Sequence, residues 1–163
     1  GVRPAKTDAH LHEVALAAST LAERRTGALI VFARKEGLRN FIENGIALDA
    51  RLSFDLLVSI FTPDAPLHDG AIIIQAERIA AASCFLPLTA NPELAKEHGS
   101  RHRAALGISE EADALALVVS EESGEISLAV GGELERNLDK SQLAIRLHYH
   151  LLTDADSSLR RGR

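Results

Sequence analysis

The first motif that could do chemistry is an aspartate at the mouth of a predicted strand. Asp69 follows a proline-bracketed loop and precedes Gly70 and a run of apolar residues. A carboxylate in that position can hold a hard divalent cation, and the glycine lets a phosphate or a ribose approach the backbone. In isolation, an ordinary Asp-Gly turn is the better explanation of the pair. The neighbouring His68 could add a metal ligand or be a loop histidine.

The second motif is the basic sequence Ser100-Arg101-His102-Arg103 at the predicted start of a helix. Backbone amides at a helix start point at an anion, and the helix dipole favours negative charge there. Arginine adds a planar fork of donors that matches phosphate oxygens. Each cation at this end disfavours the helix itself by about 0.3–1 kcal/mol, so two arginines suggest an anion that offsets the repulsion. The alternative is a solvated basic turn.

A third polar motif, Ser120-Glu121-Glu122-Ser123-Gly124, follows a predicted buried strand. Either Glu121 or Glu122 could complete a metal site with Asp69, and the alternative is a plain hairpin turn. Taken together, the three motifs supply an acid, a basic phosphate cradle and a second acid. A metal–triphosphate substrate requires that combination, so we expect the motifs to face one nucleotide.

Length and composition limit the class of protein. The 163 residues are enough for one domain with a sizeable core. The net charge of −5 argues against broad nucleic-acid binding, which needs a basic surface. The only cysteine, Cys84, lies in an apolar run, so we expect a small core residue and a reducing cytosol rather than a disulfide. No apolar stretch approaches the roughly 20 residues of a membrane-spanning helix, and we expect a soluble fragment.

Helical and strand patterns alternate along the chain, which predicts an α/β domain with a central mixed sheet flanked by helices. Helices are expected over residues 8–25, 34–44, 53–61, 92–98, 101–106 and 138–152. Strands are expected over residues 28–32, 46–50, 71–74, 79–86, 114–119 and 125–130, and Gly131-Gly132 could lead into a further strand or a bend. The third and fourth strands should form a hairpin at the centre of the sheet. The sequence contains neither a dinucleotide-binding glycine motif nor a P-loop.

Helix ends and domain limits follow from the same patterns. Asp8, Ser53 and Ser100 are predicted N-caps, and Gly99 is predicted to close the helix before it. The folded domain is expected to cover residues 1–153. Residues 154–163 are expected to form a disordered tail with a basic end, which consists of Arg160, Arg161 and Arg163.

Two pairs of histidines lie outside these motifs. His10 and His12 could bind a metal, but His-x-His places the two side chains on different faces of a helix, which favours solvated histidines. His148 and His150 lie on the last predicted helix, where surface or edge positions fit better than ligand roles.

With these motifs assembled, the chain resembles the diadenylate cyclase domain family. The two family signatures stand intact as Asp69-Gly70-Ala71 and Arg101-His102-Arg103. The resemblance covers roughly residues 21–139. Further similar stretches are Gly27-Ala28-Leu29-Ile30-Val31, Glu43-Asn44-Gly45-Ile46, Pro66-Leu67-His68, Leu86-Pro87-Leu88 and Ser120-Glu121-Glu122-Ser123-Gly124.

The resemblance implies roles for individual residues. Asp69 would ligate the catalytic metal and help to activate the ribose 3′-hydroxyl. Arg101 and Arg103 would bind the triphosphate together with Ser100, and His102 would order the turn. The metal ligands implied by the resemblance are Asp69, His68 and Glu122. The ATP-binding residues implied are Gly27, Phe85, Leu86, Pro87, Ser100, Arg101, Arg103, Ser120 and Glu122.

Two positions depart from the family pattern. Ser100 replaces a threonine but keeps the hydroxyl group. Phe85 stands where tyrosine is common, so a hydroxyl contact in the adenine pocket is lost. The segment from Phe85 to Pro87 would border the adenine, with backbone groups of Leu86 reading its edge.

The family reaction joins two ATP molecules into cyclic di-AMP and releases two pyrophosphates with the help of Mg²⁺, Mn²⁺ or Co²⁺. One domain that holds one ATP cannot close the ring, so a two-fold homodimer is expected. The sequence is most similar to the subclass whose domain follows transmembrane helices. That likeness implies a full-length protein at the cytoplasmic face of the membrane, where a membrane-bound regulator could act through the missing N-terminal part. The alternative is a non-catalytic nucleotide-binding regulatory module on the same fold.

Overall fold

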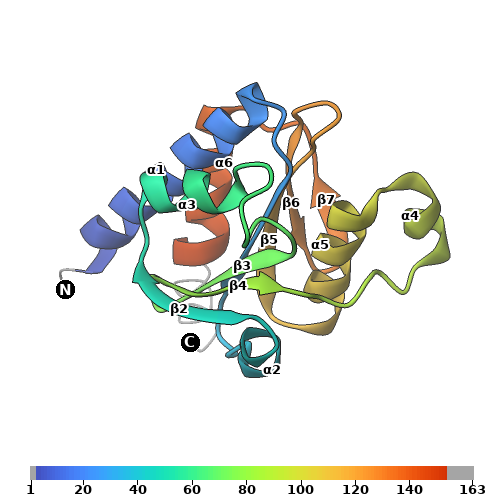
Figure 1. The fold of residues 1–163 in the computed structure, drawn as a ribbon, viewed down its shortest axis with the longest axis horizontal. Helices are drawn as coiled ribbons and strands as arrows, with labels where there is room; N and C mark the ends of the chain where they lie inside the picture. The colour runs from blue at the N-terminus through green and yellow to red at the C-terminus, as the bar shows by residue number, and fades with distance from the viewer. Residues whose placement is uncertain (1–2, 154–163) are drawn as a thin grey trace.

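Seven strands form one mixed sheet in the order β2-β4-β3-β1-β5-β6-β7 (Figure 1). The computed structural model describes the backbone of residues 3–153 and the side chains of residues 9–152. Strand β1 runs parallel to β3, and every other neighbouring pair is antiparallel. The strands are β1 (Ala28–Ala33), β2 (Ile46–Arg51), β3 (Ala71–Gln75), β4 (Arg78–Cys84), β5 (Ala114–Val119), β6 (Ile126–Val130) and β7 (Glu133–Glu135). The predicted mixed α/β domain is confirmed.

Helices cover both faces of the sheet (Figure 1). The helices are α1 (Arg3–Glu23), α2 (Arg39–Glu43), α3 (Phe54–Phe61), α4 (Pro92–Glu97), α5 (Ser100–Glu111) and α6 (Lys140–His148), and a π-helical turn, η1 (Tyr149–Thr153), ends the described chain. Helices α1, α3 and α6 pack on one face, and α5 packs on the other together with the short α2. No helix in residues 3–153 has the length and hydrophobicity needed to cross a bilayer.

The central strand β1 shows why the two layers form. Ile30 and Phe32 pack into the core beneath α1, whereas Leu29 and Val31 pack into the core beneath α5. Successive strand side chains point to opposite faces, so a strand covered on both faces must be apolar throughout. The unbroken apolar run of the sequence is therefore the signature of this central position.

Helix α5 approaches the loop that follows β4 very closely. A Cβ added to Gly107 would lie within bonding distance of the Pro87 carbonyl group, so glycine is required there. Small residues of the sheet beneath α5, such as Ala114 and Ala116, allow the same close approach. This packing, together with the hydrogen bond from the Thr89 amide to the Arg103 carbonyl oxygen, holds α5 against the loop that follows β4.

The predicted β3–β4 hairpin is confirmed, with Ala76 and Glu77 in left-handed conformation at its tight turn. Its predicted place at the centre of the sheet is wrong, because β1 occupies that position. The pattern could not separate these strands, since β1 and β3 are equally apolar. The capping role of Ser53 is confirmed, because its side chain accepts a hydrogen bond from the Leu56 amide.

Several predicted helix ends are wrong. Helix α1 begins at Arg3, so Asp8 lies inside it rather than at its N-cap. The predicted helix 34–44 is reduced to α2, which begins at Arg39. Gly99 is the N-cap of α5 rather than the end of the preceding helix, and Ser100 is the first helical residue. Helix α5 extends to Glu111, well beyond the predicted residue 106, because Gly107 does not interrupt it.

The C-terminal region also differs from the expectation. Strand β7 follows Gly131 and Gly132, where the sequence left a strand or a bend open, and helix α6 starts at Lys140, where Asp139 forms a capping box with Gln142. His150 is buried, with 8% of its surface exposed, although a surface or edge position was predicted. The predicted basic tail lies outside the described residues.

Candidate functional site

Two adjoining cavities meet at the N-terminal end of α5. The first, of about 160 Å³, is lined by Asp69 and Gly70 and by the residues that follow β4. The second, of about 240 Å³, is lined by the turn after β5 and by the first turn of α5. Ser100 and Arg101 form part of both walls. Motifs that are 31 residues apart in the chain, at Asp69 and Ser100, therefore line one continuous site.

The position of Asp69 follows from the start of β3. Gly70 has φ of +85°, and an added Cβ would lie 2.9 Å from the Cys84 carbonyl oxygen. Only glycine accommodates both the conformation and the contact. Ser83 also has positive φ, and the β3–β4 register shifts next to Ala71. This irregular strand end directs the chain so that Asp69 lines the first cavity.

Arg101 crosses the start of β1 to reach the turn after β5. A Cβ added to Gly27 would lie 2.5 Å from Arg101 Nη1, so the guanidinium packs directly on the glycine backbone. Arg101 Nη1 also lies 3.3 Å from Glu121 Oε1. The predicted site residue Gly27 therefore serves as the surface on which Arg101 rests.

The turn after β5 is held by the hydroxyl group of Ser120. This oxygen accepts hydrogen bonds from the amides of Glu122 and Ser123, both at 3.2 Å. Arg25 Nη1 donates to the Glu122 carbonyl oxygen at 2.7 Å. Glu121 and Glu122 consequently project from a well-held turn at the wall of the second cavity.

The structure separates the two arginines of the basic motif. Arg101 lines both cavities, whereas Arg103 lines neither of them. The buried Nε of Arg103 has no hydrogen-bond partner among the described residues, and its carbonyl oxygen accepts from the Thr89 amide at 2.9 Å. Along an α-helix, residues two apart point in different directions, so the motif cannot present both guanidinium groups to one place without movement.

His102 stacks on His98 within the second cavity, with ring centroids 5.6 Å apart and an interplanar angle of 17°. Burial lowers the pKa of His102, and the nearby His98 and Arg136 lower it further, while Glu125 acts in the opposite direction. Arg136 donates to the Glu125 carboxylate from Nε at 2.9 Å and Nη2 at 3.3 Å. This hydrogen bonding lowers the pKa of Glu125.

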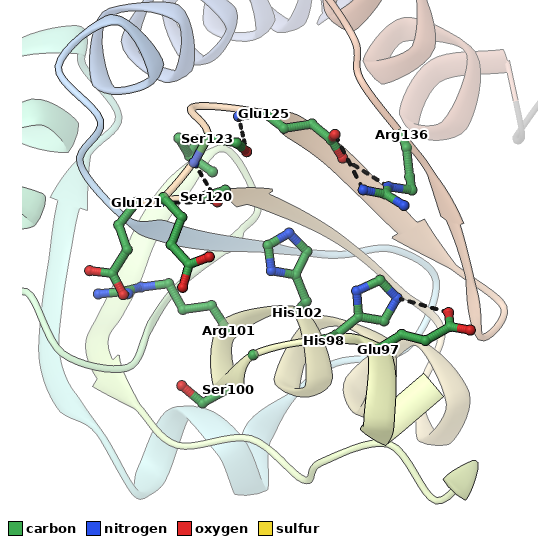
Figure 2. Close-up of a pocket in the computed structure, with 13 residues that line it drawn as sticks. Glu97, His98, Ser100, Arg101, His102, Ser120, Glu121, Ser123, Glu125 and Arg136 are labelled. Carbon is green, nitrogen blue, oxygen red and sulfur yellow. Dashed lines mark hydrogen bonds and ion pairs between the residues drawn. The ribbon is translucent and has the colours of Figure 1, made fainter. Parts of the chain in front are cut away.

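Figure 2 shows how these side chains lie in the second cavity. The His98 and His102 rings lie between two ion pairs, Arg101 with Glu121 and Arg136 with Glu125. Sequence reasoning missed His98, Glu125 and Arg136 as site residues. The four-residue spacing of the two histidines was the signal that could have found them, and Arg136 follows a strand that the sequence left open.

The segment after β4 borders the first cavity. Asn44 holds the backbone of Phe85 from both sides, because its amide group donates to the carbonyl oxygen at 3.2 Å and its oxygen accepts from the amide at 3.3 Å. Phe85 and Leu88 are exposed, at 62% and 51%, and Leu86 is partly buried. Cys84 is buried as expected, and burial raises the pKa of its thiol to about 11.

The donor set suits a cation that arrives with a nucleotide. Among the described side chains, those of residues 9–152, no three from His, Cys, Asp or Glu are placed to hold a metal ion by themselves. His68 Nδ1 lies 2.7 Å from the Ala65 carbonyl oxygen, so Nε2 is the ring nitrogen with which His68 could bind a metal. Asp69 lines the first cavity and Glu122 lines the second, and each supplies carboxylate oxygens that can bind a cation. Mg²⁺-type ions bind proteins through one or two carboxylates and complete their shell with phosphates and water, which fits this arrangement.

Comparison with known proteins decides the family. The family model described as DisA bacterial checkpoint controller nucleotide-binding, abbreviated DAC, matches residues 15–134. The chain belongs to the DAC family. The resemblance that the two motifs indicated is therefore confirmed.

Curated relatives of this DAC chain carry names that state an activity. It is 53% identical over 133 residues to a diadenylate cyclase of Listeria monocytogenes, and that match covers 82% of this chain and 49% of the relative. It is 47% identical over 133 residues to the cyclic di-AMP synthase CdaA of Bacillus subtilis, with the same two coverages. The chain thus spans about half the length of these relatives.

Two solved structures are similar to the fold of this DAC domain. DacA from Staphylococcus aureus, a double mutant, matches with a TM-score of 0.87 and 45% identity over 90% of this chain and 98% of the solved chain. A hypothetical membrane spanning protein from Bacillus cereus matches with a TM-score of 0.74 and 47% identity over 77% of this chain and 61% of the other.

Proposed function

We propose that this domain is a diadenylate cyclase, which condenses two ATP molecules into cyclic di-AMP and releases two pyrophosphates. The observation that carries the proposal is that Asp69 and Arg101, from two remote motifs, line one continuous site. The names of the relatives support the same activity. In each of two steps, a ribose 3′-oxygen bonds to an α-phosphorus, the bond from that phosphorus to the β-phosphate oxygen breaks, and pyrophosphate departs with the electron pair.

Asp69 is proposed to act at the attacking hydroxyl group. A 3′-hydroxyl is a weak nucleophile at neutral pH, so a carboxylate within reach of its proton is required. Asp69 lines the cavity next to Gly70, which leaves room for the ribose against the backbone. The proton that leaves the hydroxyl group passes to this carboxylate and from there to solvent.

Ser100, Arg101 and Ser120 are proposed to bind the triphosphate. Ser100 and Arg101 lie in the first turn of α5, where the helix dipole favours negative charge. The guanidinium of Arg101 is fixed by Gly27 and can stabilise charge on the phosphoryl oxygens as the bond breaks. Arg103 is proposed to reach phosphate only after a rotation of its side chain, and His102 is proposed to order the helix start.

A divalent cation, Mg²⁺, Mn²⁺ or Co²⁺, is proposed to enter with the nucleotide. Asp69 and Glu122 would hold it, and His68 could add its Nε2 nitrogen. When bound, the cation lowers the pKa of the attacking hydroxyl group and neutralises phosphate charge. Glu121 is paired with Arg101 in the structure, which leaves Glu122 as the better second ligand.

The adenine is proposed to lie along Phe85, Leu86 and Pro87 at the border of the first cavity. Apolar side chains there offer a stacking surface, and backbone groups of Leu86 offer hydrogen bonds to the base edge. Because Asn44 clamps the Phe85 backbone, this edge is rigid before the nucleotide binds.

Ring closure is proposed to require two domains that face each other across a two-fold axis. Each active site contributes one ATP, and the 3′-oxygen of each nucleotide attacks the α-phosphorus of the other. A full-length protein at the cytoplasmic face of the membrane, with a membrane-bound regulator, belongs to the same proposal. The membrane spanning protein among the similar structures supports it.

The activity is tested by incubating the chain with ATP and Mn²⁺ and analysing the products by mass spectrometry. We expect cyclic di-AMP and pyrophosphate, at a rate that rises faster than linearly with protein concentration. A concentrated, folded sample that yields no cyclic di-AMP would overturn the proposal. ATP binding without turnover would instead favour the alternative, a non-catalytic nucleotide-binding module on the same fold.

A further inference from the structure

A second arginine–glutamate pair faces the phosphate end of the site. Glu125, at the start of β6, binds Arg136, which follows β7, through two hydrogen bonds of 2.9 and 3.3 Å. Arg136 lines the same 240 Å³ cavity as Ser100 and Arg101. The catalytic scheme proposed above gives no role to either member of this pair.

The second pair resembles the first in position and chemistry. Both ion pairs join an arginine to a glutamate of the β5–β6 connection, and the stacked His98 and His102 rings lie between them (Figure 2). The Arg136 side chain is 60% exposed, so it can reorient without unpacking the core. The polar cavity therefore continues beyond Arg101 and ends at a second guanidinium group, which is exposed.

The charges of this cavity select the kind of ligand it can hold. Four glutamates line it, at positions 97, 121, 122 and 125, against only two arginines. A bare anion is disfavoured among these carboxylates, whereas an anion that carries a divalent cation is not. A metal–diphosphate can replace the contacts within an arginine–glutamate ion pair. The arginine then binds phosphate oxygens, and the glutamate binds the cation.

We infer that the His98, His102, Glu125 and Arg136 end of the cavity is a subsite for the leaving pyrophosphate and its divalent cation. Arg136 moves from Glu125 to a phosphate oxygen as the pyrophosphate separates, and the Glu125 carboxylate then faces the cation. The subsite rests on the proposed function, because diadenylate formation supplies the pyrophosphate. It holds the product away from the α-phosphorus and thereby opposes the reverse attack.

Calorimetric titration of the whole chain with Mg²⁺–pyrophosphate tests the subsite without any turnover. Loss of a charge-assisted hydrogen bond should raise the dissociation constant of Arg136→Ala by about tenfold. Arg136→Lys should recover part of this loss. The matched control is Arg78→Ala, because Arg78 is also half exposed and bonds Asp49 at 2.7 Å, but lies on β4 away from the cavity. The control should bind pyrophosphate as the wild type does.

A second variant separates a binding role from a structural one. Glu125→Gln keeps the shape of the side chain but removes the charge that holds Arg136. Metal-free pyrophosphate should therefore bind to this variant more tightly than to the wild type, by about threefold or more. A merely structural ion pair would instead weaken binding in Arg136→Ala and Glu125→Gln alike. Weaker binding in both variants would overturn the inference. So would an unchanged dissociation constant in Arg136→Ala, or a wild type that does not bind pyrophosphate.

The same samples distinguish this inference from the proposed function. If the wild type forms cyclic di-AMP while Arg136→Ala binds pyrophosphate normally, only the subsite is wrong. If pyrophosphate binding depends on Arg136 but no cyclic di-AMP forms, this end of the cavity binds pyrophosphate and the proposed reaction is wrong. Product inhibition by added pyrophosphate should weaken in Arg136→Ala in parallel with its dissociation constant.

Discussion

The same three residue types form two clusters that differ in how many partners hold each charge. The cavity cluster consists of His102, Glu125 and Arg136, and the closed cluster consists of His150, Glu135 and Arg146. In the closed cluster, Glu135 accepts from Arg146 at 2.8 Å through both oxygens and contacts His150 Nε2 at 2.8 Å.

Arg146 also lies 4.5 Å from the centre of the Tyr149 ring, and His150 is 8% exposed. Each group of the closed cluster thus has a partner that holds it. In the cavity cluster, Arg136 is 60% exposed and the His102 ring lines an open cavity. Residue type alone therefore does not identify a functional cluster: Glu135 pairs with both Arg146 and His150, whereas the less tightly held set lines the cavity to which we assign pyrophosphate.

The largest effect on the rate is expected at Asp69, which lines the cavity that adjoins the cavity cluster. Asp69→Asn removes the carboxylate for the 3′-hydroxyl and the cation, so the rate of cyclic di-AMP formation should fall by about 10³-fold or more. The melting temperature should stay close to that of the wild type. The matched control is Asp49→Asn, which changes an exposed aspartate away from the cavities. Full activity in Asp69→Asn would remove this residue from the mechanism.

The next effect concerns the surface on which Arg101 rests. Gly27→Ala places a Cβ 2.5 Å from Arg101 Nη1, which displaces the guanidinium from the phosphate path. A misplacement of this size should lower the rate by about 100-fold. Gly37→Ala is the control, because its added Cβ meets only Gln75 Oε1 at 3.7 Å. Equal rates for the two variants would show that Arg101 adjusts freely.

A smaller effect, on stability alone, is expected in the closed cluster. Glu135→Gln removes the charge that holds Arg146 and His150, so the free energy of unfolding should fall by about 1–2 kcal/mol. The rate per folded molecule should not change, since this cluster lies outside both site cavities. Denaturant titration and product analysis on one sample measure both quantities. Loss of activity without loss of stability would contradict the division between the clusters.

The smallest effect concerns the pH dependence of stability through His102. Its pKa in the folded protein lies below the ordinary value of 6.5, so the unfolded chain binds the proton more readily. Stability from this group is complete above pH 6.5 and is lost as the pH falls through the folded pKa. His102→Gln should therefore lose less stability between pH 8 and pH 5 than the wild type. Parallel pH profiles of the urea midpoint would show that His102 makes no such contribution.

The sequence predicted the layers and most strands because local patterns determine them. The apolar runs of β1, β3 and β5 identify strands covered on both faces, and Ser53 marks a helix start through its side-chain cap. The order of strands in the sheet was not accessible, because β1 and β3 have the same pattern. The start of α1 and the true cap of α5 also depended on backbone geometry that several sequences allow.

The sequence predicted the residues of the candidate site that belong to its motifs. Asp69, Ser100, Arg101, Ser120 and Glu122 were named from the sequence, and all of them line the two joined cavities. The division between Arg101 and Arg103 was not predicted, because it depends on how α5 is rotated against the sheet. Likewise, Glu125 and Arg136 come together only through the pairing of β6 with β7, which carries no local signal.

The central claim is that one metal–ATP lies between Asp69 and Arg101. A crystal of the wild-type chain soaked with 3′-deoxy-ATP and Mn²⁺ tests it directly, because the analogue lacks the attacking hydroxyl group and manganese gives an anomalous signal. We expect an anomalous manganese peak at the Asp69 carboxylate, with the triphosphate bound against Ser100 and Arg101. A nucleotide bound elsewhere, or manganese that does not contact Asp69, would contradict it.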